Sequence, residues 1–176
     1  MRAIPCRSAL SSIPLIAASA IAAGVLAAPA QAATGGAQAD VQQQVDQVVS
    51  EHPGARQTGP GRVTFGNGVV LTIPSDGAAA GQCDSGSYCF FQYTNYGGRK
   101  LTFKDCSDNG LWQYLTDYGF GNKTSSWQNS STNTVLVYNQ ATTPPTTLWT
   151  ENPGTESSDV GTAVDNKADA FETFCG

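Results

Sequence analysis

The chain has 176 residues, among them nine Lys and Arg, fourteen Asp and Glu and a single His, which give a formal net charge of −5 at pH 7. Nucleic acids and anionic membranes are bound through clustered basic side chains, so this composition excludes both as preferred partners. The length accommodates one domain together with a shorter additional segment.

The N-terminal residues have the pattern of a secretory signal peptide. Arg2 and Arg7 provide a positive start, residues 13–28 are apolar, and Pro29-Ala30-Gln31-Ala32 ends in a small-x-small cleavage pattern. A membrane anchor is the alternative, but the apolar run is shorter than the roughly 20 residues that a spanning helix needs. We therefore predict that residues 1–32 are a signal peptide and that the protein is secreted and extracellular. Cleavage would remove two basic residues and no acidic one, which lowers the net charge to −7.

A short helix is predicted near the start of the secreted chain. Residues 33–39 are rich in Gly, Ala and Gln and are expected to be flexible. Asp40 can cap the helix that follows, with Gln43 as its reciprocal partner, and valines then recur on one face at helical spacing. His52-Pro53-Gly54 ends the helix. Because its apolar face consists only of valines, this helix needs another element to pack on.

A β-hairpin and a linker complete the N-terminal part of the chain. Residues 62–65 and 69–73 flank a Gly-Asn-Gly turn, which is typical of a hairpin. Residues 74–82 are rich in Ser, Gly and Ala and read as a linker. We therefore expect an N-terminal helix–hairpin module or pro-region over 33–82 and the main domain over 83–176. Whether the first part is removed is not decided by the sequence.

Four cysteines remain after the predicted signal peptide, and an even number in an exported chain predicts two disulfide bonds. Four cysteines allow three pairings, and the sequence alone does not decide among them. We favour Cys83–Cys89, which closes a short loop that bends easily, together with Cys106–Cys175, which ties the middle of the domain to its end. A zinc site is disfavoured because no C-x-x-C pattern is present and the only His, His52, is distant in sequence.

The main domain is predicted to be all-β. Turn residues separate its β-branched and aromatic segments, which are residues 88–93, 100–104, 134–138 and 147–150. Short strands at this spacing indicate a sandwich or a Greek-key barrel. The core of so short a domain is marginal, which is consistent with stabilisation by disulfides.

An internal repeat relates two parts of the main domain. Asn122-Lys123 recurs as Asn166-Lys167, and the aromatic Trp127 recurs as Phe171, in both cases 44 positions later. Chance similarity in a turn-rich chain is the alternative explanation. The matched aromatic favours duplication, and we therefore predict two four-strand units that pack face to face.

The main domain resembles secreted bacterial βγ-crystallin-like proteins of the peptidase inhibitor I36 family. Residues 83–99 resemble the opening of this family, and Phe91 to Gly98 fits the crystallin Greek-key signature of an aromatic, six residues and a glycine. The later serine of that signature would be Ser125 or Ser126. Residues 115–127, which end at Trp127, resemble the family's second block, and residues 165–169 resemble its closing block. The sequence departs from the pattern in the second repeat, where Pro145 replaces the expected glycine.

The resemblance implies a βγ-crystallin-like double Greek-key sandwich and a secreted protein that acts by binding an extracellular peptidase, without catalysis. The residues also disfavour an enzyme, because a catalytic triad in the main domain needs a His and the only one lies before it. We expect a monomer. Three loops could contact a peptidase, namely 84–87, 106–110 and 141–147, and neither the loop nor the target is decided by the sequence.

Calcium binding is an alternative function that the family resemblance also implies. The family's calcium loops have the form (Asn/Asp)-(Asn/Asp)-x-x-(Ser/Thr)-Ser, and the corresponding stretches are residues 121–126 and 165–170, with Asp169 in place of the Ser or Thr in the second. Calcium prefers several oxygen ligands. Its candidate ligands are Asn122, the Lys123 carbonyl and Ser125 in the first loop, and Asp165, Asn166 and Asp169 in the second. Gly121 lacks a side chain expected in the first loop, and both loops could simply form Greek-key corners. No other cofactor is expected.

A third possible function is an antimicrobial or cell-wall-binding module. The domain is rich in aromatic residues, about half of which should belong to the core. An exposed subset could bind glycan. The aromatic residues concerned are Tyr93, Tyr96, Trp112, Tyr114, Tyr118, Phe120, Trp127 and Trp149.

Overall fold

The computed structural model describes residues 32–75 and 78–176, and the predicted signal peptide lies outside them except for its last residue. No helix within these ranges is both long and apolar enough to cross a membrane. One α-helix, one 3-10 helix and a set of short strands follow in chain order: α1 (Ala32–Glu51), β1 (Arg56–Gly59), β2 (Arg62–Thr64), β3 (Val70–Thr72), β4 (Tyr88–Tyr93), β5 (Gly97–Phe103), β6 (Leu111–Tyr114), η1 (Leu115–Tyr118), β7 (Ser126–Asn129), β8 (Thr134–Asn139), β9 (Thr146–Glu151), β10 (Glu156–Ser157) and β11 (Ala170–Phe174).

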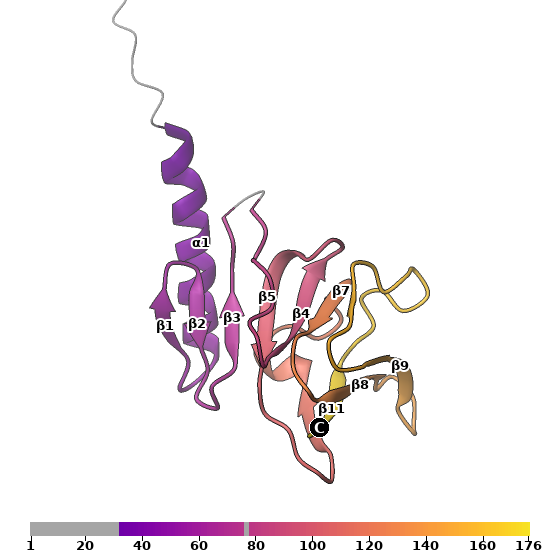
Figure 1. Cartoon of the computed structure of the whole chain (residues 1–176). Helices are drawn as coiled ribbons and strands as arrows, with labels where there is room; N and C mark the ends of the chain where they lie inside the picture. The colour runs from indigo at the N-terminus through magenta and orange to yellow at the C-terminus, as the bar shows by residue number, and fades with distance from the viewer. Residues whose placement is uncertain (1–31, 76–77) are drawn as a thin grey trace, which may run out of the picture. The chain divides into compact units, whose positions relative to one another are not determined.

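The strands form two antiparallel sheets (Figure 1). Sheet A has the order β1-β2-β3-β5-β4-β7-β10, and sheet B has the order β6-β11-β8-β9. Strands β4 to β7 form one four-strand unit and β8 to β11 a second. Each unit contributes its first, second and fourth strands to one sheet and its third strand to the other, because β6 pairs with β11 and β10 pairs with β7. This exchange produces the predicted βγ-crystallin-like double Greek-key sandwich, which is therefore confirmed.

The repeat predicted from the sequence is also visible in the backbone. The amide of Asn122 donates to the carbonyl of Ala168 at 2.8 Å, and the amide of Asn166 donates to the carbonyl of Thr124 at 3.1 Å. Both asparagines have positive φ, 56° and 54°, a conformation that Asn tolerates better than most residues. The two loops thus hold each other by equivalent hydrogen bonds from residues 44 positions apart.

Aromatic side chains fill the space between the two sheets. Tyr88 and Phe90 of β4 and Phe103 of β5 face Phe171 of β11, and all four are buried. The ring centroids of Phe103 and Phe171 lie 4.8 Å apart, and those of Tyr88 and Phe103 lie 5.6 Å apart. Aromatic pairs at these distances contribute beyond the area they bury, so a short chain obtains a dense core from few residues.

Helix α1 is longer than expected, since it begins at Ala32 rather than near Asp40. The expectation that residues 33–39 are flexible is therefore wrong. Ala and Gln in this stretch are good helix formers, which outweigh its two glycines. The valine face packs as the sequence required, because Val45 and Val48 are buried in the same cluster as the sheet core.

The predicted hairpin continues sheet A. Strands β2 and β3 pair as expected, and β3 then pairs with β5, with Leu71 opposite Leu101. Strand β1, which was not predicted, adds an outer strand. The division of the chain at residue 83 stays a prediction, but the two parts share one sheet and one core.

Candidate functional site

Both disulfides pair in the favoured way. Cys83 is bonded to Cys89, with Cα atoms 5.8 Å apart, and Cys106 is bonded to Cys175, with Cα atoms 5.1 Å apart. The short bridge anchors the start of the main domain against β4. The long bridge joins the connection before β6 to the residue that follows β11. The Cys83–Cys89 bridge encloses the loop 84–87, and the Cys106–Cys175 bridge holds the start of the loop 106–110. The third loop, 141–147, follows β8 and leads into β9, and these two strands pair with each other.

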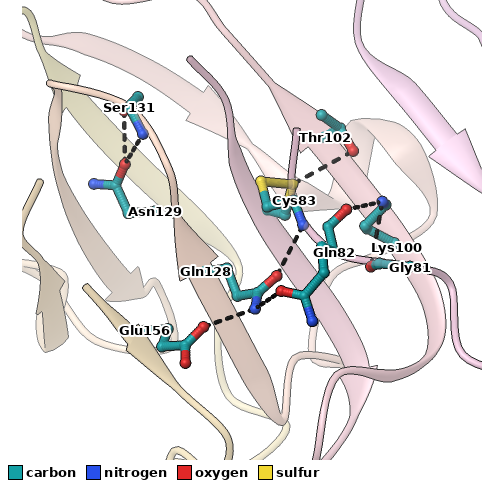
Figure 2. The surroundings of a disulfide bond; sticks show 10 residues. Gly81, Gln82, Cys83, Lys100, Thr102, Gln128, Asn129, Ser131 and Glu156 are labelled. Atoms are coloured by element: carbon teal, nitrogen blue, oxygen red, sulfur yellow. Dashed lines mark hydrogen bonds between the residues drawn. A yellow bond between two sulfur atoms is a disulfide. The ribbon is translucent and has the colours of Figure 1, made fainter. Parts of the chain in front are cut away.

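A polar network fixes the chain around the short disulfide (Figure 2). The side-chain oxygen of Gln128 accepts from the Cys83 amide at 2.8 Å, and its amide nitrogen donates to Gln82 at 2.8 Å and to Glu156 at 2.7 Å. Lys100 donates to the Gln82 carbonyl at 2.7 Å. Burial lowers the pKa of Lys100, and nearby Asp84 opposes this shift. The network leaves the backbone of this segment little freedom.

The loop within the short disulfide presents little surface. The amide of Gly86 donates to the Ser130 carbonyl at 2.8 Å, and the amide of Ser130 donates to the Ser87 carbonyl at 2.8 Å. Ser87 is buried, and only residues 84–86 of the loop are exposed. This loop is rigid, but it is a small contact surface.

The loop at residues 106–110 is tied down along most of its length. The amide of Ser107 donates to the Thr173 carbonyl, and the amide of Cys175 donates to the Ser107 carbonyl. Gly110 has φ +84°, and a Cβ at this position would lie 2.2 Å from a Glu172 carboxylate oxygen. Only Asp108 and Asn109 are exposed here, so this loop also offers a small surface.

The connection between β8 and β9 is different, because residues 140–145 and the first two residues of β9 are all exposed. We call this segment the 140–147 loop. Within it, Thr142 Oγ1 donates to the Pro144 carbonyl at 2.9 Å and lies 2.8 Å from Thr146 Oγ1. At its base, the amide of Ala141 donates to Asn139 Oδ1 at 2.7 Å. The loop is therefore exposed along its whole length and braced, that is, held in shape by hydrogen bonds within it and at its base.

The first Greek-key corner follows the predicted signature. Gly98 has φ +68°, and a Cβ there would lie 2.6 Å from the Tyr93 ring, so glycine is required. Of the two candidate serines, Ser126 closes the corner: its hydroxyl donates to the Tyr93 carbonyl at 2.6 Å and accepts from the Tyr96 amide at 3.1 Å. Phe91 is fully buried and Trp127 is 7% exposed, so both are structural.

The six predicted calcium ligands lie on the two loops that hold each other. Asp165 Oδ2 accepts from Asn166 Nδ2 at 2.9 Å, whereas Asp165 Oδ1 is buried and makes no hydrogen bond to any described residue. Asp169 Oδ2 accepts from the Gln140 amide at 3.2 Å, so this carboxylate is engaged at the base of the 140–147 loop. Ser125 is 5% exposed. Asn122 and Asn166 are held by their reciprocal amide hydrogen bonds to Ala168 and Thr124, and Lys123 follows Asn122 in the first loop.

Among the six predicted ligands, only Asp165 has a buried side-chain oxygen without a hydrogen-bond partner in the described residues. The first loop lies beside it, because the amide of Asn166 donates to the carbonyl of Thr124 at 3.1 Å. A calcium site at Asp169 would lack a side chain at Gly121 and would need Asp169 to leave Gln140. Across residues 32–75 and 78–176, no group of three or more His, Cys, Asp or Glu side chains is placed to hold a metal ion, so a calcium site would depend on hydroxyl and carbonyl oxygens as well.

Residues 77–149 match the model of the family described as peptidase inhibitor family I36. The predicted resemblance to family I36 is confirmed. The match includes the first Greek-key unit, the short disulfide and the whole 140–147 loop. The I36 segment ends within β9, so the last two strands lie beyond it.

Solved structures to which the chain is similar are βγ-crystallin domains. One, from work on the evolution of the eye lens βγ-crystallin domain fold, is 9% identical, covers 61% of this chain and 98% of that chain, and has a TM-score of 0.47. A βγ-crystallin domain from Clostridium beijerinckii is 20% identical, covers 50% of this chain and 97% of its own, and has a TM-score of 0.40. No curated protein sequence matches the chain at a significant level.

Sequence reasoning missed two features that the fold creates. Glu151 at the end of β9 is fully buried, yet in the sequence it is one acid among several turn residues. The outer face of sheet B gathers aromatic residues from β6 and β8, but β6 was not predicted as a strand. The alternation in Leu111-Trp112-Gln113-Tyr114 was the available signal for that face.

Proposed function

We propose that this chain is a secreted inhibitor of an extracellular peptidase, that it acts without catalysis, and that the 140–147 loop contacts the peptidase. The exposure of every residue in this loop is the observation that carries the proposal. The match of residues 77–149 to family I36 supports the same role. The two disulfides are consistent with an oxidising, extracellular location.

Bracing of the loop lowers the free-energy cost of binding. The hydrogen bonds of Thr142 and Asn139 hold the loop in one arrangement before any partner arrives. A pre-organised loop loses less conformational entropy in a complex, and this saving appears directly in the affinity. Residues 140–147 also include no charged side chain, so a peptidase cleft would not have to desolvate an ion.

The experiment is an inhibition panel. The oxidised chain without its predicted signal peptide is titrated against metallo-, serine and cysteine peptidases. We expect saturable inhibition of one class by protein that remains uncleaved. Thr142→Val removes the hydroxyl that braces the loop and should weaken inhibition by about tenfold, as expected for the loss of one or two hydrogen bonds.

Ser85→Ala is the matched control, because Ser85 is exposed in the short disulfide loop. It should leave the inhibition constant unchanged. If Ser85→Ala weakens inhibition while Thr142→Val does not, the contact lies at the short disulfide loop instead. If micromolar protein inhibits no peptidase, the inhibitor proposal is wrong.

Calcium binding at a single site is a second candidate, favoured by Asp165 Oδ1, which is buried and has no hydrogen-bond partner among the described residues. Asp165, Ser125 and the carbonyl of Lys123 would hold the ion, which would supply positive charge to a buried carboxylate oxygen. With the modest affinity of extracellular modules, ten times the dissociation constant of CaCl2 should stabilise the fold by about 1.4 kcal/mol. Scanning calorimetry with CaCl2 and MgCl2 measures this gain.

Two variants make the calcium test specific. Asp165→Asn should abolish the rise in Tm caused by CaCl2, because the amide cannot supply the charge. Asp117→Asn removes an exposed acid in η1 and should leave the rise intact. An equal rise in all three chains, or none in the unaltered one, would rule out a calcium site at Asp165.

A further inference from the structure

The outer face of sheet B carries a set of aromatic residues that the core does not use. Trp112 of β6, Glu172 of β11 and Leu136 of β8 lie opposite one another in register, as do Tyr114, Ala170 and Tyr138. Phe171 and Thr173 of β11 are buried in the core. Because side chains alternate along a strand, the side chains of the two rows Trp112–Glu172–Leu136 and Tyr114–Ala170–Tyr138 lie on the face of sheet B that is turned away from the core.

The aromatic rings on this face meet across β11. The ring centroids of Trp112 and Tyr138 lie 4.8 Å apart with planes tilted by 30°, and those of Trp112 and Tyr114 lie 6.3 Å apart with planes at 70°. Ala170, which pairs with Tyr114 and Tyr138, is fully buried although it is on the outer face. The three rings therefore adjoin one another through Trp112 in one layer, in which Tyr114 is 41% exposed and Trp112 and Tyr138 are partly exposed. We call this layer the aromatic platform.

Hydroxyl groups and one carboxylate border the aromatic platform. Thr147 and Thr150 of β9 are exposed and lie opposite Tyr138 and Leu136. Glu172 packs against Gly110, where a Cβ would collide with its carboxylate, and lies 3.5 Å from the Tyr138 hydroxyl. Apolar rings beside hydrogen-bonding groups match a sugar, whose ring has apolar C–H faces and a rim of hydroxyls.

Charge distinguishes among the possible binding partners of this face. Glu172 is the only charged side chain among the residues of these two rows, and the whole chain has a net charge of −5. An anionic polymer would be repelled. A second copy related by a two-fold axis would bring two Glu172 carboxylates together, since such an interface uses the same patch twice. An uncharged, extended polysaccharide avoids both penalties and can lie flat on the strands.

We propose that the aromatic platform of sheet B, formed by Trp112, Tyr114 and Tyr138, binds an uncharged extended polysaccharide. This activity differs from peptidase inhibition: Thr147 adjoins both surfaces, but none of the hydrogen bonds that brace the 140–147 loop involves one of the three rings. It would retain the secreted protein on a polysaccharide surface.

Depletion of the oxidised full chain by insoluble cellulose and by chitin tests the proposal. We expect saturable retention on at least one of the two polymers. Tyr114→Ala should weaken retention by about fivefold to tenfold because it removes the most exposed ring, whereas Tyr114→Phe keeps the ring and should retain binding. Tyr114 is exposed enough for both variants to fold, which circular dichroism verifies.

Tyr93→Ala is the matched control, since Tyr93 is a 59% exposed aromatic on β4 in sheet A. It should bind like the unaltered chain. Absence of retention on both polymers overturns the proposal, as does an equal loss in the Tyr93 and Tyr114 variants. Sedimentation that reveals a dimer dissociated by Tyr114→Ala would also overturn it, because the platform would then be a self-association surface.

Discussion

Replacement of Cys106 and Cys175 by alanine should lower the free energy of unfolding by about 4 kcal/mol. The bridge joins residues 69 positions apart, and the entropy that a cross-link removes from the unfolded chain grows with the loop it closes. In the folded chain, this bridge secures the end of β11, which lies between β6 and β8 in sheet B. Urea denaturation of the oxidised double variant measures the loss.

The Cys83/Cys89 double variant is the internal comparison. Its bridge spans only six positions, so the same argument gives a loss of about 2.4 kcal/mol. The network of Gln128 and Lys100 also continues to hold the segment after the bridge is removed. If the short bridge proves to contribute more than the long one, loop entropy does not govern the stability of this fold.

Glu151 should make the fold less stable as pH rises from about 4.5 to 8. Its side chain is fully buried, Oε1 accepts from the Trp149 indole at 3.0 Å, and Oε2 makes no hydrogen bond within the described residues. Burial raises the pKa of this carboxyl from its ordinary 4.5 to about 8, and the Trp149 hydrogen bond opposes the shift only in part. The folded chain therefore holds a neutral acid at neutral pH.

The direction of the effect follows from proton uptake. Below about pH 4.5 the carboxyl is protonated in both the folded and the unfolded chain, so its contribution to stability is complete. Between pH 4.5 and 8 the unfolded chain releases this proton while the folded chain keeps it. Stability then falls by roughly 1.4 kcal/mol per pH unit from this group, several kcal/mol in all, and levels off above pH 8.

Glu151→Gln tests this expectation. The amide cannot ionise, so the fall in stability between pH 4.5 and 8 should be absent from denaturation curves of the variant. At low pH the variant should be less stable by about 1–3 kcal/mol, because its amide N–H groups are buried without an acceptor. Parallel pH dependences for the two chains would show that Glu151 is ionised in the fold.

The sequence alone predicted the features that depend on local chemistry. The aromatic, six-residue, glycine spacing of Phe91 to Gly98 fixed the first corner, because only glycine avoids the Tyr93 ring at that φ. Strand β4 coincides with its predicted bounds. The 44-residue spacing of Asn122 and Asn166 indicated duplication, since each asparagine occupies the same left-handed position in its own unit.

Contacts between distant segments explain the strands that were missed. Strands β7, β10 and β11 were not predicted, and each pairs with strands remote from it in the sequence. The early start of helix α1 was missed for a local reason, because helix-forming Ala and Gln outweigh the glycines of residues 33–39. The segment 141–147 was one of three candidate loops until the structure showed that, of the three, it alone is exposed along its whole length.

The amino-acid sequence by itself indicated the all-β class, the duplicated unit and the I36 resemblance, since each depends on residue type and spacing, whereas the cysteine pairing was decided only by the structure. Only the tertiary structure decided which strand joins which sheet, that the N-terminal hairpin extends sheet A, and that Glu151 is buried while Tyr114 is exposed. These features depend on pairing and packing between segments remote in the sequence. Such contacts place distant residues on one face, and no local pattern encodes that placement.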